Sequence, residues 1–282
     1  MKLIRTGAEW NPLWLNHLQK NHQIGLVPTM GALHEGHLQL VRKSKQRSDL
    51  TVVSIFVNPT QFNNSEDFAK YPVTLEDDLE KLSSEGVDYV FAPEVREIYP
   101  TPTKLRFDFG DLERVLEGKF RPGHFNGVGV VVSKLFHIIK PHRAFFGQKD
   151  LQQVGIIRRL VSDLSFDLEL EIVPTHREPN GLAMSSRNVR LNPVEREKAL
   201  MLFKSLESAK SGLFQGKPWT EIQKQVVADF EVEPLAKLEY FDLVNPETFE
   251  AHSEFSKNRK SSICIAAYIG DVRLIDNMPL VS

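Results

Sequence analysis

Several features that define whole classes of proteins are scarce or missing in this sequence. There is a single cysteine, Cys264, so an internal disulfide is excluded and a reducing compartment is expected. Cys264 stands in an apolar run, where its ordinary role is that of a small buried side chain. The formal net charge is only −2 and no long basic run occurs, which gives a nucleic-acid partner no electrostatic support.

Long hydrophobic runs are also missing. No segment approaches the length of a transmembrane helix without charges, and residues 1–5 lack the apolar core of a signal peptide. We therefore expect a cytoplasmic protein with neither a membrane nor a nucleic acid as its partner. The 282 residues, 41% of them hydrophobic, are ample for one large domain or two smaller ones.

Through the first two thirds of the chain, short apolar segments alternate with helical patterns. Strands are predicted at 24–27, 50–57, 87–91, 144–146 and 168–173, and helices at 36–46, 74–84, 128–139 and 151–162. Residues 51–57 are nearly all β-formers, as in a parallel strand that is buried on both faces. This alternation predicts an α/β fold with a doubly wound parallel sheet, in which ligands bind at the carboxyl ends of the strands.

The pattern changes in the last third. Helices are predicted at 193–213 and 219–230, followed by strands at 238–243, 263–268 and 272–275, with a hairpin turn at Gly270 and Asp271. A run of helices and then strands predicts a smaller α+β domain. We place the boundary so that residues 1–180 form a Rossmann-like domain and residues 181–282 form a C-terminal domain that closes over the site.

The most informative segment runs from Met30 to His37 and reads Met-Gly-Ala-Leu-His-Glu-Gly-His. A strand, a glycine-containing loop and a helix present free backbone N–H groups to a phosphate, and Gly31 and Gly36 permit close approach. His34 and His37 are three apart, so they share a face if the helix begins near them, and both can donate hydrogen bonds to phosphate oxygens. Surface polarity and a metal site are the alternatives. No cysteine cluster or second histidine pair supports the metal site.

A second segment, far downstream, complements the first. It contains Met184, Ser185, Ser186 and Arg187, and a glycine-containing run before it favours a mobile loop. Its hydroxyls, N–H groups and arginine could close over a triphosphate, whereas the alternative is a polar interdomain linker. Taken in order on a chain of alternating strands and helices, the two segments resemble the paired nucleotide signatures of the class I nucleotidyltransferase superfamily.

A third segment, Gly147-Gln148-Lys149-Asp150, directly follows a predicted strand. Lys149 can reach a phosphate and neutralise charge in phosphoryl chemistry, and Asp150 is a candidate helix N-cap. Gln153 would face the same cleft about one helical turn further on. The alternative for Lys149 is a solvated surface lysine.

Two pairs of polar residues are candidates for substrate binding. Asn58 and Gln61 follow the second predicted strand, where they could fix a small polar substrate or belong to an ordinary Asn-Pro turn. Arg121 and His124 could bind an anion at the start of a helix or belong to a glycine-rich cap.

An acidic pair, Asp77 and Asp78, lies in the first turn of a predicted helix. Acidic residues favour helix N-termini because of the helix dipole, which is the structural explanation. The functional explanation is coordination of magnesium beside phosphates.

Four strings in this order resemble motifs of the pantoate–β-alanine ligase family: VPTMGALHEGH at 27–37, FVNPTQF at 56–62, FFGQKD at 145–150 and GLAMSSRN at 181–188. The resemblance spans the first predicted domain and the linker after it. In the second domain, RLIDN at 273–277 is its clearest part. The family often has Glu in place of Gln148 and varies at Thr60, and neither position is a proposed catalytic residue.

The resemblance implies a two-step ligation in pantothenate (vitamin B5) and coenzyme A biosynthesis. ATP and pantoate give pantoyl adenylate and pyrophosphate, and β-alanine then attacks the acyl adenylate to give pantothenate and AMP. An acyl adenylate hydrolyses when wet, so a loop that closes over it has a physical purpose. The family is typically a homodimer, and its ATP is expected to carry Mg²⁺.

The resemblance also implies roles for individual residues. His37 would be the proton donor, with His34, Lys149 and Arg187 completing the catalytic set. Gln61 and Gln153 would hold pantoate, and Gln61 would also help to place β-alanine.

The largest implied set of contacts belongs to ATP. Lys149 would bind phosphate, Asp150 would bind ribose, and the main chain near His176 would contact adenine. Asp77 and Asp78 would bind Mg²⁺. The expected ATP-binding residues are Met30, Gly31, Ala32, Leu33, His34, Glu35, Gly36, His37, Gly147, Gln148, Lys149, Asp150, His176, Met184, Ser185, Ser186 and Arg187.

Two other functions compete with this interpretation. One is a nucleotidyltransferase that makes a dinucleotide product without an amine step. The amides of Asn58, Gln61 and Gln153 favour a small polar acid instead, because a phosphorylated acceptor should call for more basic residues. The other is a non-catalytic nucleotide-sensing or RNA-binding module on the same fold. The joint presence of the histidines, the lysine and the arginine disfavours it, and the near-neutral charge disfavours RNA.

Overall fold

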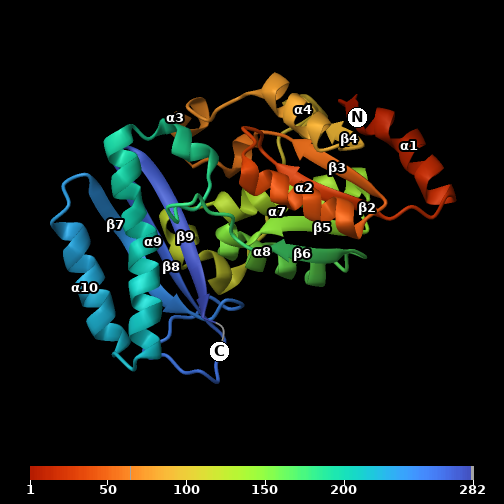
Figure 1. Cartoon of the computed structure of the whole chain (residues 1–282). Coiled ribbons are helices and arrows are strands. Elements are labelled where there is room, and N and C mark those ends of the chain that lie inside the picture. The colour runs from red at the N-terminus through yellow and green to blue at the C-terminus, as the bar shows by residue number, and fades with distance from the viewer. Residues whose placement is uncertain (64, 281–282) are drawn as a thin grey trace.

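The larger half of the molecule is built on a six-stranded parallel sheet (Figure 1). The computed structural model describes residues 1–63 and 65–280. In spatial order the strands are β1 (Lys2–Ile4), β4 (Tyr89–Phe91), β3 (Leu50–Ile55), β2 (Ile24–Thr29), β5 (Arg143–Gly147) and β6 (Glu169–Val173). Each strand runs parallel to its neighbours. Leu50–Ile55 is buried along nearly its whole length, as a parallel strand covered on both faces should be, and it buries the hydroxyls of Thr51 and Ser54 together with its apolar side chains.

Helices cover both faces of this sheet. One face carries α1 (Gly7–Gln19), α7 (His124–Ile139) and α8 (Leu151–Asp163), and the other carries α2 (Glu35–Arg47) and α4 (Leu75–Ser84). Three short helices lie in the connections: α3 (Ser65–Ala69), α5 (Val95–Ile98) and α6 (Leu116–Phe120). The two apolar cores, one on each face, make the sheet doubly wound, as the sequence predicts.

The strand order reverses at the centre of the sheet. From β2 the chain continues to β3 and β4 on one side, whereas β5 and β6 lie on the other side of β2. The loops that leave the carboxyl ends of β2 and β5 therefore diverge and leave a crevice between them. This crevice is the position that the fold offers to a ligand.

The smaller half is an antiparallel three-stranded sheet with two helices. Its elements are α9 (Pro193–Phe214), α10 (Trp219–Glu231), β7 (Ala236–Val244), β8 (Ser261–Ile269) and β9 (Val272–Leu280). Along β8, Ile263 and Ile265 pack against the helices, whereas Cys264 packs with Leu151 of the larger half. The sheet therefore buries one face against its own helices and part of the other against the first domain (Figure 1). The proposed boundary at residue 180 falls between β6 and Leu182, where the second core begins.

The predicted strands and helices are all present, with ends that differ by a few residues. The sequence analysis predicts neither β1 and α1 nor the short helices α3, α5 and α6. β1 has only three residues, which is too short for a pattern, but α1 begins with a capping box that is visible in the sequence. In it, the Glu9 N–H donates to Thr6 Oγ1 at 3.2 Å, and the Thr6 N–H donates to Glu9 Oε2 at 3.3 Å. α7 begins four residues before the predicted helix, which brings His124 into its first turn.

Cys264 is buried, as predicted, and forms no disulfide. Within residues 1–63 and 65–280, no helix combines the length and the apolar character needed to cross a membrane.

The junction of the two halves yields a stability prediction. A Cβ added to Gly155 of α8 would lie 2.5 Å from Phe249 Cε2, and Phe249 belongs to the buried junction core. Gly155→Ala should therefore lower the free energy of unfolding by about 1–3 kcal/mol, measured by urea denaturation. Gly7→Ala is the matched control, because its new Cβ meets only ordinary contacts at 3.5 and 3.6 Å. Equal stability of Gly155→Ala and the wild type would mean that the junction is loosely packed.

Candidate functional site

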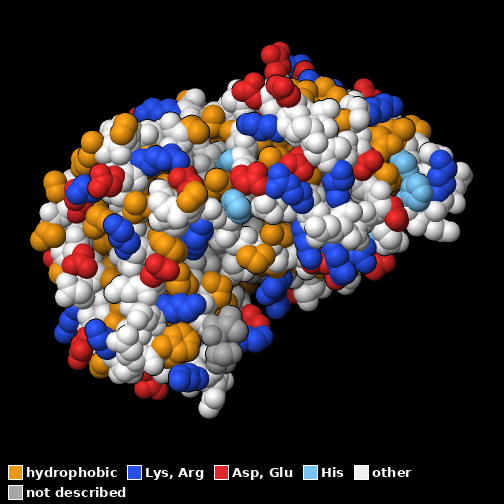
Figure 2. Space-filling model, in the orientation of Figure 1, with side chains coloured by type: hydrophobic (Ala, Val, Ile, Leu, Met, Phe, Trp, Pro, Cys, Tyr) orange, Lys and Arg blue, Asp and Glu red, His pale blue; other side chains and the backbone are white. Residues whose placement is uncertain are grey.

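A cavity of about 230 Å³ lies between the two halves, over the crevice between β2 and β5. Figure 2 shows histidine side chains reaching the surface at the middle of this face, where the two halves meet. Residues from four separate predicted segments and from both halves of the chain meet here. The predicted site residues that line it are Met30, His34, Gly36, His37, Asn58, Gln61, Arg121, His124, Gly147, Lys149, Asp150, Gln153, His176, Met184, Ser185, Ser186 and Arg187.

The loop after β2 takes its shape from a buried carboxylate. Gly31 and Ala32 have φ angles of +81° and +49°, which turn the chain toward α2. The N–H groups of Ala32 and Leu33 donate to the two oxygens of Asp78 at 2.8 and 2.7 Å. Asp78 is fully buried, so this carboxylate holds the loop.

Some predicted residues have other tasks. The magnesium role of Asp77 and Asp78 stays a prediction: each oxygen of Asp78 accepts one hydrogen bond from the loop, and neither residue lines the cavity. Glu35 turns to Arg42 on the surface of α2, and Gln148 pairs with the second sheet. Gly31, Ala32 and Leu33 shape the cavity from behind without lining it.

His34 and His37 pack against each other at the start of α2. Their ring centroids are 4.1 Å apart, and the His34 N–H donates to His37 Nδ1 at 3.4 Å. A neutral His37 must then carry its proton on Nε2. Burial, and then the charges of His37 and Lys149, lower the pKa of His34 to about 2. Burial likewise lowers the pKa of His37 to about 4, so both rings are neutral hydrogen-bond donors at pH 7.

His34 carries a clear sign of a missing partner. Its Nδ1 is buried and has no hydrogen-bond partner in the described part of the chain. Buried polar atoms in native proteins are nearly always satisfied, so an orphan at a cavity wall is expected where a ligand binds.

Lys149 and Asp150 approach the histidines from the other side of the crevice. They end a short helical turn, Gln148–Asp150, which leads from β5 into α8. The Lys149 ammonium lines the cavity and makes no side-chain hydrogen bond or ion pair within the described residues. Its charge lowers the pKa of both histidines, whereas the Asp150 carboxylate opposes the fall for His37. An unpaired cation beside two neutral donors suits an anionic ligand.

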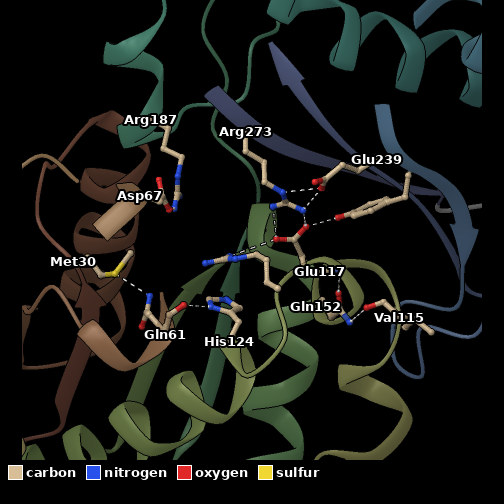
Figure 3. Close-up of polar contacts among 12 residues, drawn as sticks. Met30, Gln61, Asp67, Val115, Glu117, His124, Gln152, Arg187, Glu239 and Arg273 are labelled. Carbon is tan, nitrogen blue, oxygen red and sulfur yellow. Dashed lines mark hydrogen bonds and ion pairs between the residues drawn. The ribbon is translucent and has the colours of Figure 1, made fainter. Parts of the chain in front are cut away.

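Arg187 covers the cavity from the second half of the chain. It lies on the turn Ser186–Arg190, and its Nη2 donates to Asp67 Oδ2 at 2.8 Å, as Figure 3 shows. Its guanidinium stands 5.8 Å from the ring centre of Tyr71, whose hydroxyl is 3.1 Å from Ser186 Oγ. Asp67 and Tyr71 have no signal in the sequence that links them to Arg187.

Gln61 closes the inner end of the cavity. Its Nε2 donates to Met30 Sδ at 2.9 Å, and Asn58 Nδ2 donates to Gln61 Oε1 at 3.1 Å. His124 Nδ1 lies 2.8 Å from the Gln61 carbonyl oxygen (Figure 3). Burial and the charge of Arg121 lower the pKa of His124 to about 3, so it is neutral and donates this bond. Asn58 and His124 therefore hold Gln61 in place.

The structure adds a buried charge network that the sequence analysis missed. Glu117 accepts from Arg273 Nη1 and Nη2 at 2.8 and 2.6 Å and from the Tyr240 hydroxyl at 2.8 Å (Figure 3). Arg121 Nη1 lies 3.5 Å from the same carboxylate. Burial alone would raise the pKa of Glu117, but the Arg273 guanidinium outweighs it and holds the pKa at about 2. Arg273 also pairs with Glu239, so the network joins α6 to β7 and β9 along one wall of the cavity.

Comparison with known proteins gives a consistent result. A family model described as pantoate-beta-alanine ligase matches residues 2–279. A curated pantothenate synthetase from Cytophaga hutchinsonii is 46% identical over 268 residues, 93% of each chain. Another from Thermosipho africanus is 48% identical over 278 residues, 99% of each chain.

Solved structures agree with the sequence comparison. The crystal structure of pantothenate synthetase from Thermus thermophilus matches with a TM-score of 0.93 and 39% identity over 100% of each chain. A pantoate-beta-alanine ligase from Francisella tularensis, complexed with beta-gamma ATP and beta-alanine, matches with a TM-score of 0.82 and 37% identity. That match covers 99% of this chain and 98% of the other.

The buried histidines yield a pH prediction. Unfolded histidine has a pKa near 6.5, whereas His34 and His37 have pKa values of about 2 and about 4 in the fold. Below pH 6.5 the unfolded chain binds more protons, so the free energy of unfolding should fall as the pH drops from about 6.5 toward 4. His34→Asn combined with His37→Asn should flatten this decline in urea denaturation between pH 5 and 7. The exposed His137→Asn is the control, and an unchanged slope in the double variant would contradict the inferred burial.

Proposed function

The chain belongs to the pantoate-beta-alanine ligase family, and we propose that it joins pantoate to β-alanine with ATP, giving pantothenate, AMP and pyrophosphate. The observation that carries this proposal is the cavity over the β2–β5 crevice. There, the neutral histidine pair and a lysine without an ionic partner in residues 1–63 and 65–280 lie beside the amides of Gln61 and Gln153. The side with the histidines and the lysine suits phosphates, and the side with the two glutamines suits a small polar acid.

The first step in this proposal is adenylation. A pantoate carboxylate oxygen forms a bond to the α-phosphorus of ATP, and the bond from that phosphorus to the bridging oxygen of pyrophosphate breaks. The N–H groups of His34 and His37 donate to phosphate oxygens, where negative charge grows. Lys149 and Arg187 neutralise the leaving pyrophosphate. The neutral state of the histidines supports this role, because a buried neutral N–H donates without adding a charge that must be desolvated.

The remaining ATP contacts are proposals of the same kind. Met30, Asp150 and Met184 surround the nucleoside, with Asp150 on the ribose and the main chain near His176 on the adenine. Ser185 and Ser186 close over the phosphates. All six of these residues line the cavity, which supports the assignment.

Mg²⁺ accompanies ATP in this proposal and screens the charge of the phosphates. The described residues include no group of three or more His, Cys, Asp or Glu side chains that could hold a metal ion. Phosphate oxygens and water would supply most of its ligands, together with one or two carboxylates, as is usual for magnesium bound with phosphates.

Pantoate binds at the amides. The Gln61 amide donates only to a thioether, which is a weak acceptor, so a substrate oxygen can replace it at small cost. The Gln153 amide lines the cavity and has no hydrogen-bond partner among the described residues, which leaves it free for pantoate.

The second step forms the amide bond. The β-alanine amine attacks the carbonyl carbon of pantoyl adenylate, AMP leaves with the electrons of the broken acyl–oxygen bond, and the nitrogen releases a proton to water as the amide forms. Gln61 helps to place β-alanine, and Arg121 supplies a buried cation for its carboxylate, while His124 supports Gln61 from behind. The covering segment at Ser185–Arg187 limits loss of the intermediate to water.

We also propose that the chain is a homodimer that works in the cytoplasm. The family resemblance supports the dimer. The single, buried cysteine fits a reducing compartment.

The decisive test is ATP–pyrophosphate exchange with pantoate, with and without β-alanine. Exchange that needs pantoate but not β-alanine is expected, because adenylation is complete before the amine enters. The wild-type protein at a pH of about 7.5 with Mg²⁺ is the sample, chosen because both buried histidines are neutral there. A dinucleotide product or an absence of exchange would reject the ligase assignment.

The roles on the phosphate side predict a large kinetic effect. Lys149→Ala and His37→Ala should each slow pantoyl-adenylate formation by roughly 10²–10³-fold, since each removes a group that stabilises charge in the transition state. Pyrophosphate release in a rapid-quench assay measures this step, and the exposed Lys104→Ala is the control. Near-normal release by both variants would remove these residues from the mechanism.

Two neighbouring glutamines provide a matched test of the pantoate site. Gln153→Ala should raise the KM for pantoate about tenfold or more while leaving the melting temperature unchanged, because it removes a hydrogen bond to the substrate and none within the fold. Gln152 lines the same cavity, but its Nε2 donates to the carbonyl oxygens of Leu112 and Val115 at 2.7 and 2.9 Å. Gln152→Ala should therefore mainly destabilise the fold. An unchanged KM for pantoate in Gln153→Ala would exclude Gln153 from the pocket.

A further inference from the structure

Residues 273–277 of β9 have no role in the chemistry proposed above. Three of their side chains nevertheless make hydrogen bonds to the larger half of the molecule. Arg273 binds Glu117 on α6, and Asp276 binds Arg177 in the segment after β6. Asn277 binds the backbone of the segment that carries Lys149. One strand of the smaller sheet therefore contacts three walls of the cavity.

Asn277 makes the most specific of these contacts. Its Nδ2 donates to the carbonyl oxygens of Gln148 and Lys149 at 2.9 and 2.8 Å. Its Oδ1 accepts from Gln148 Nε2 at 3.4 Å. Only 3% of Asn277 is exposed, and it pairs in register with Cys264 at the centre of the three-stranded sheet. Both ends of this amide are therefore committed to the Gln148–Asp150 turn from a rigid strand.

The neighbouring residue fixes Asn277 itself. The Asn277 N–H donates to Asp276 Oδ1 at 2.8 Å. Arg177 grips Asp276 with both terminal nitrogens, at 2.6 and 3.0 Å, and its Nη2 also donates to the Asn277 carbonyl oxygen at 3.3 Å. The bidentate pair of Arg177 and Asp276 fixes β9 relative to the segment that leads to Ser185. The side-chain amide of Asn277 therefore has little freedom to move.

A fixed backbone matters for Lys149 because its ammonium stands at the end of a flexible four-carbon chain with no other partner in the described residues. The position of the charge depends on where the Gln148–Asp150 turn is held. A shift of about 1 Å in a catalytic group can cost about 10²-fold in rate.

We propose that Asn277 is a positioning residue for Lys149, acting across the junction of the two halves on the adenylation step. This proposal rests on the proposed function, since it assigns Lys149 to the phosphates of ATP.

The test separates the two half-reactions. Asn277→Asp keeps the shape of the side chain but replaces the donor with a charged oxygen facing two carbonyl oxygens. It should slow adenylation in rapid quench by about 10²-fold. Amide formation, measured by adding β-alanine after the adenylate has accumulated on the enzyme, should stay within about twofold of the wild type, because pyrophosphate and its contact with Lys149 have gone by then.

A double-variant cycle identifies the route of the effect. In a Lys149→Met background, Asn277→Asp should slow adenylation little further, because the charge that it positions is already missing. Multiplication of the two losses would overturn the proposal, since Asn277 would then act through another group.

The remaining outcomes are equally decisive. Met278→Ala on the same strand is the control for a destabilised sheet, because Met278 packs in the second core away from the turn. Equal slowing of both half-reactions in Asn277→Asp, or a matching effect in Met278→Ala, would reduce Asn277 to a structural residue. Wild-type-like adenylation in Asn277→Asp would also overturn the proposal. An absence of pantoate-dependent exchange in the wild type would instead reject the proposed function itself.

Discussion

At the centre of the large sheet, β2 lies between β3 and β5. The chain adds β3 and β4 on one side of β2, and it later adds β5 and β6 on the other side. Every other feature of the site depends on this reversal, because it parts the two loops and leaves their ends facing one crevice. One loop brings His34 and His37, and the other brings Lys149. A continuous strand order would place helices over these positions. The smaller half then supplies the cover, and neither half encloses the cavity alone.

Burial makes two side chains of the cavity neutral and leaves others charged. His34 and His37 lose their charge through desolvation, so they contribute hydrogen bonds to an anion without a competing buried cation of their own. The Lys149 ammonium stays unpaired among the described residues. Arg273 and Arg121, by contrast, share Glu117, which satisfies charges that would otherwise be costly to bury. The unpaired positive charge therefore lies on the side of the cavity that we assign to phosphates. At the opposite wall, Glu117 offsets the positive charges of Arg121 and Arg273.

The parts of the site that the sequence predicts are those encoded locally. The run from Met30 to His37 and the turn at Lys149 follow strands directly, so periodicity alone places them at the same sheet edge. For Asp78 the sequence leaves two roles open, a magnesium ligand and an acidic residue favoured by the helix dipole, because an acidic residue in a first helical turn suits both. Only the fold shows that this one reaches back to the N–H groups of Ala32 and Leu33. Glu117 had no signal in the sequence, and the string that contains Asn277 showed only a resemblance to a family, because the partners of the two residues stand 156 and 128 residues away.

That long separation has a consequence for the order in which the protein matures. Lys149 and both histidines leave the ribosome well before Asn277, and N-terminal domains generally fold first during synthesis. A nascent chain that lacks β9 therefore already contains both histidines and Lys149, but Asn277 does not yet hold the Gln148–Asp150 turn. Under the positioning role that we propose for Asn277, the turn that carries Lys149 is fixed only after the last strand of the smaller sheet has been made and paired.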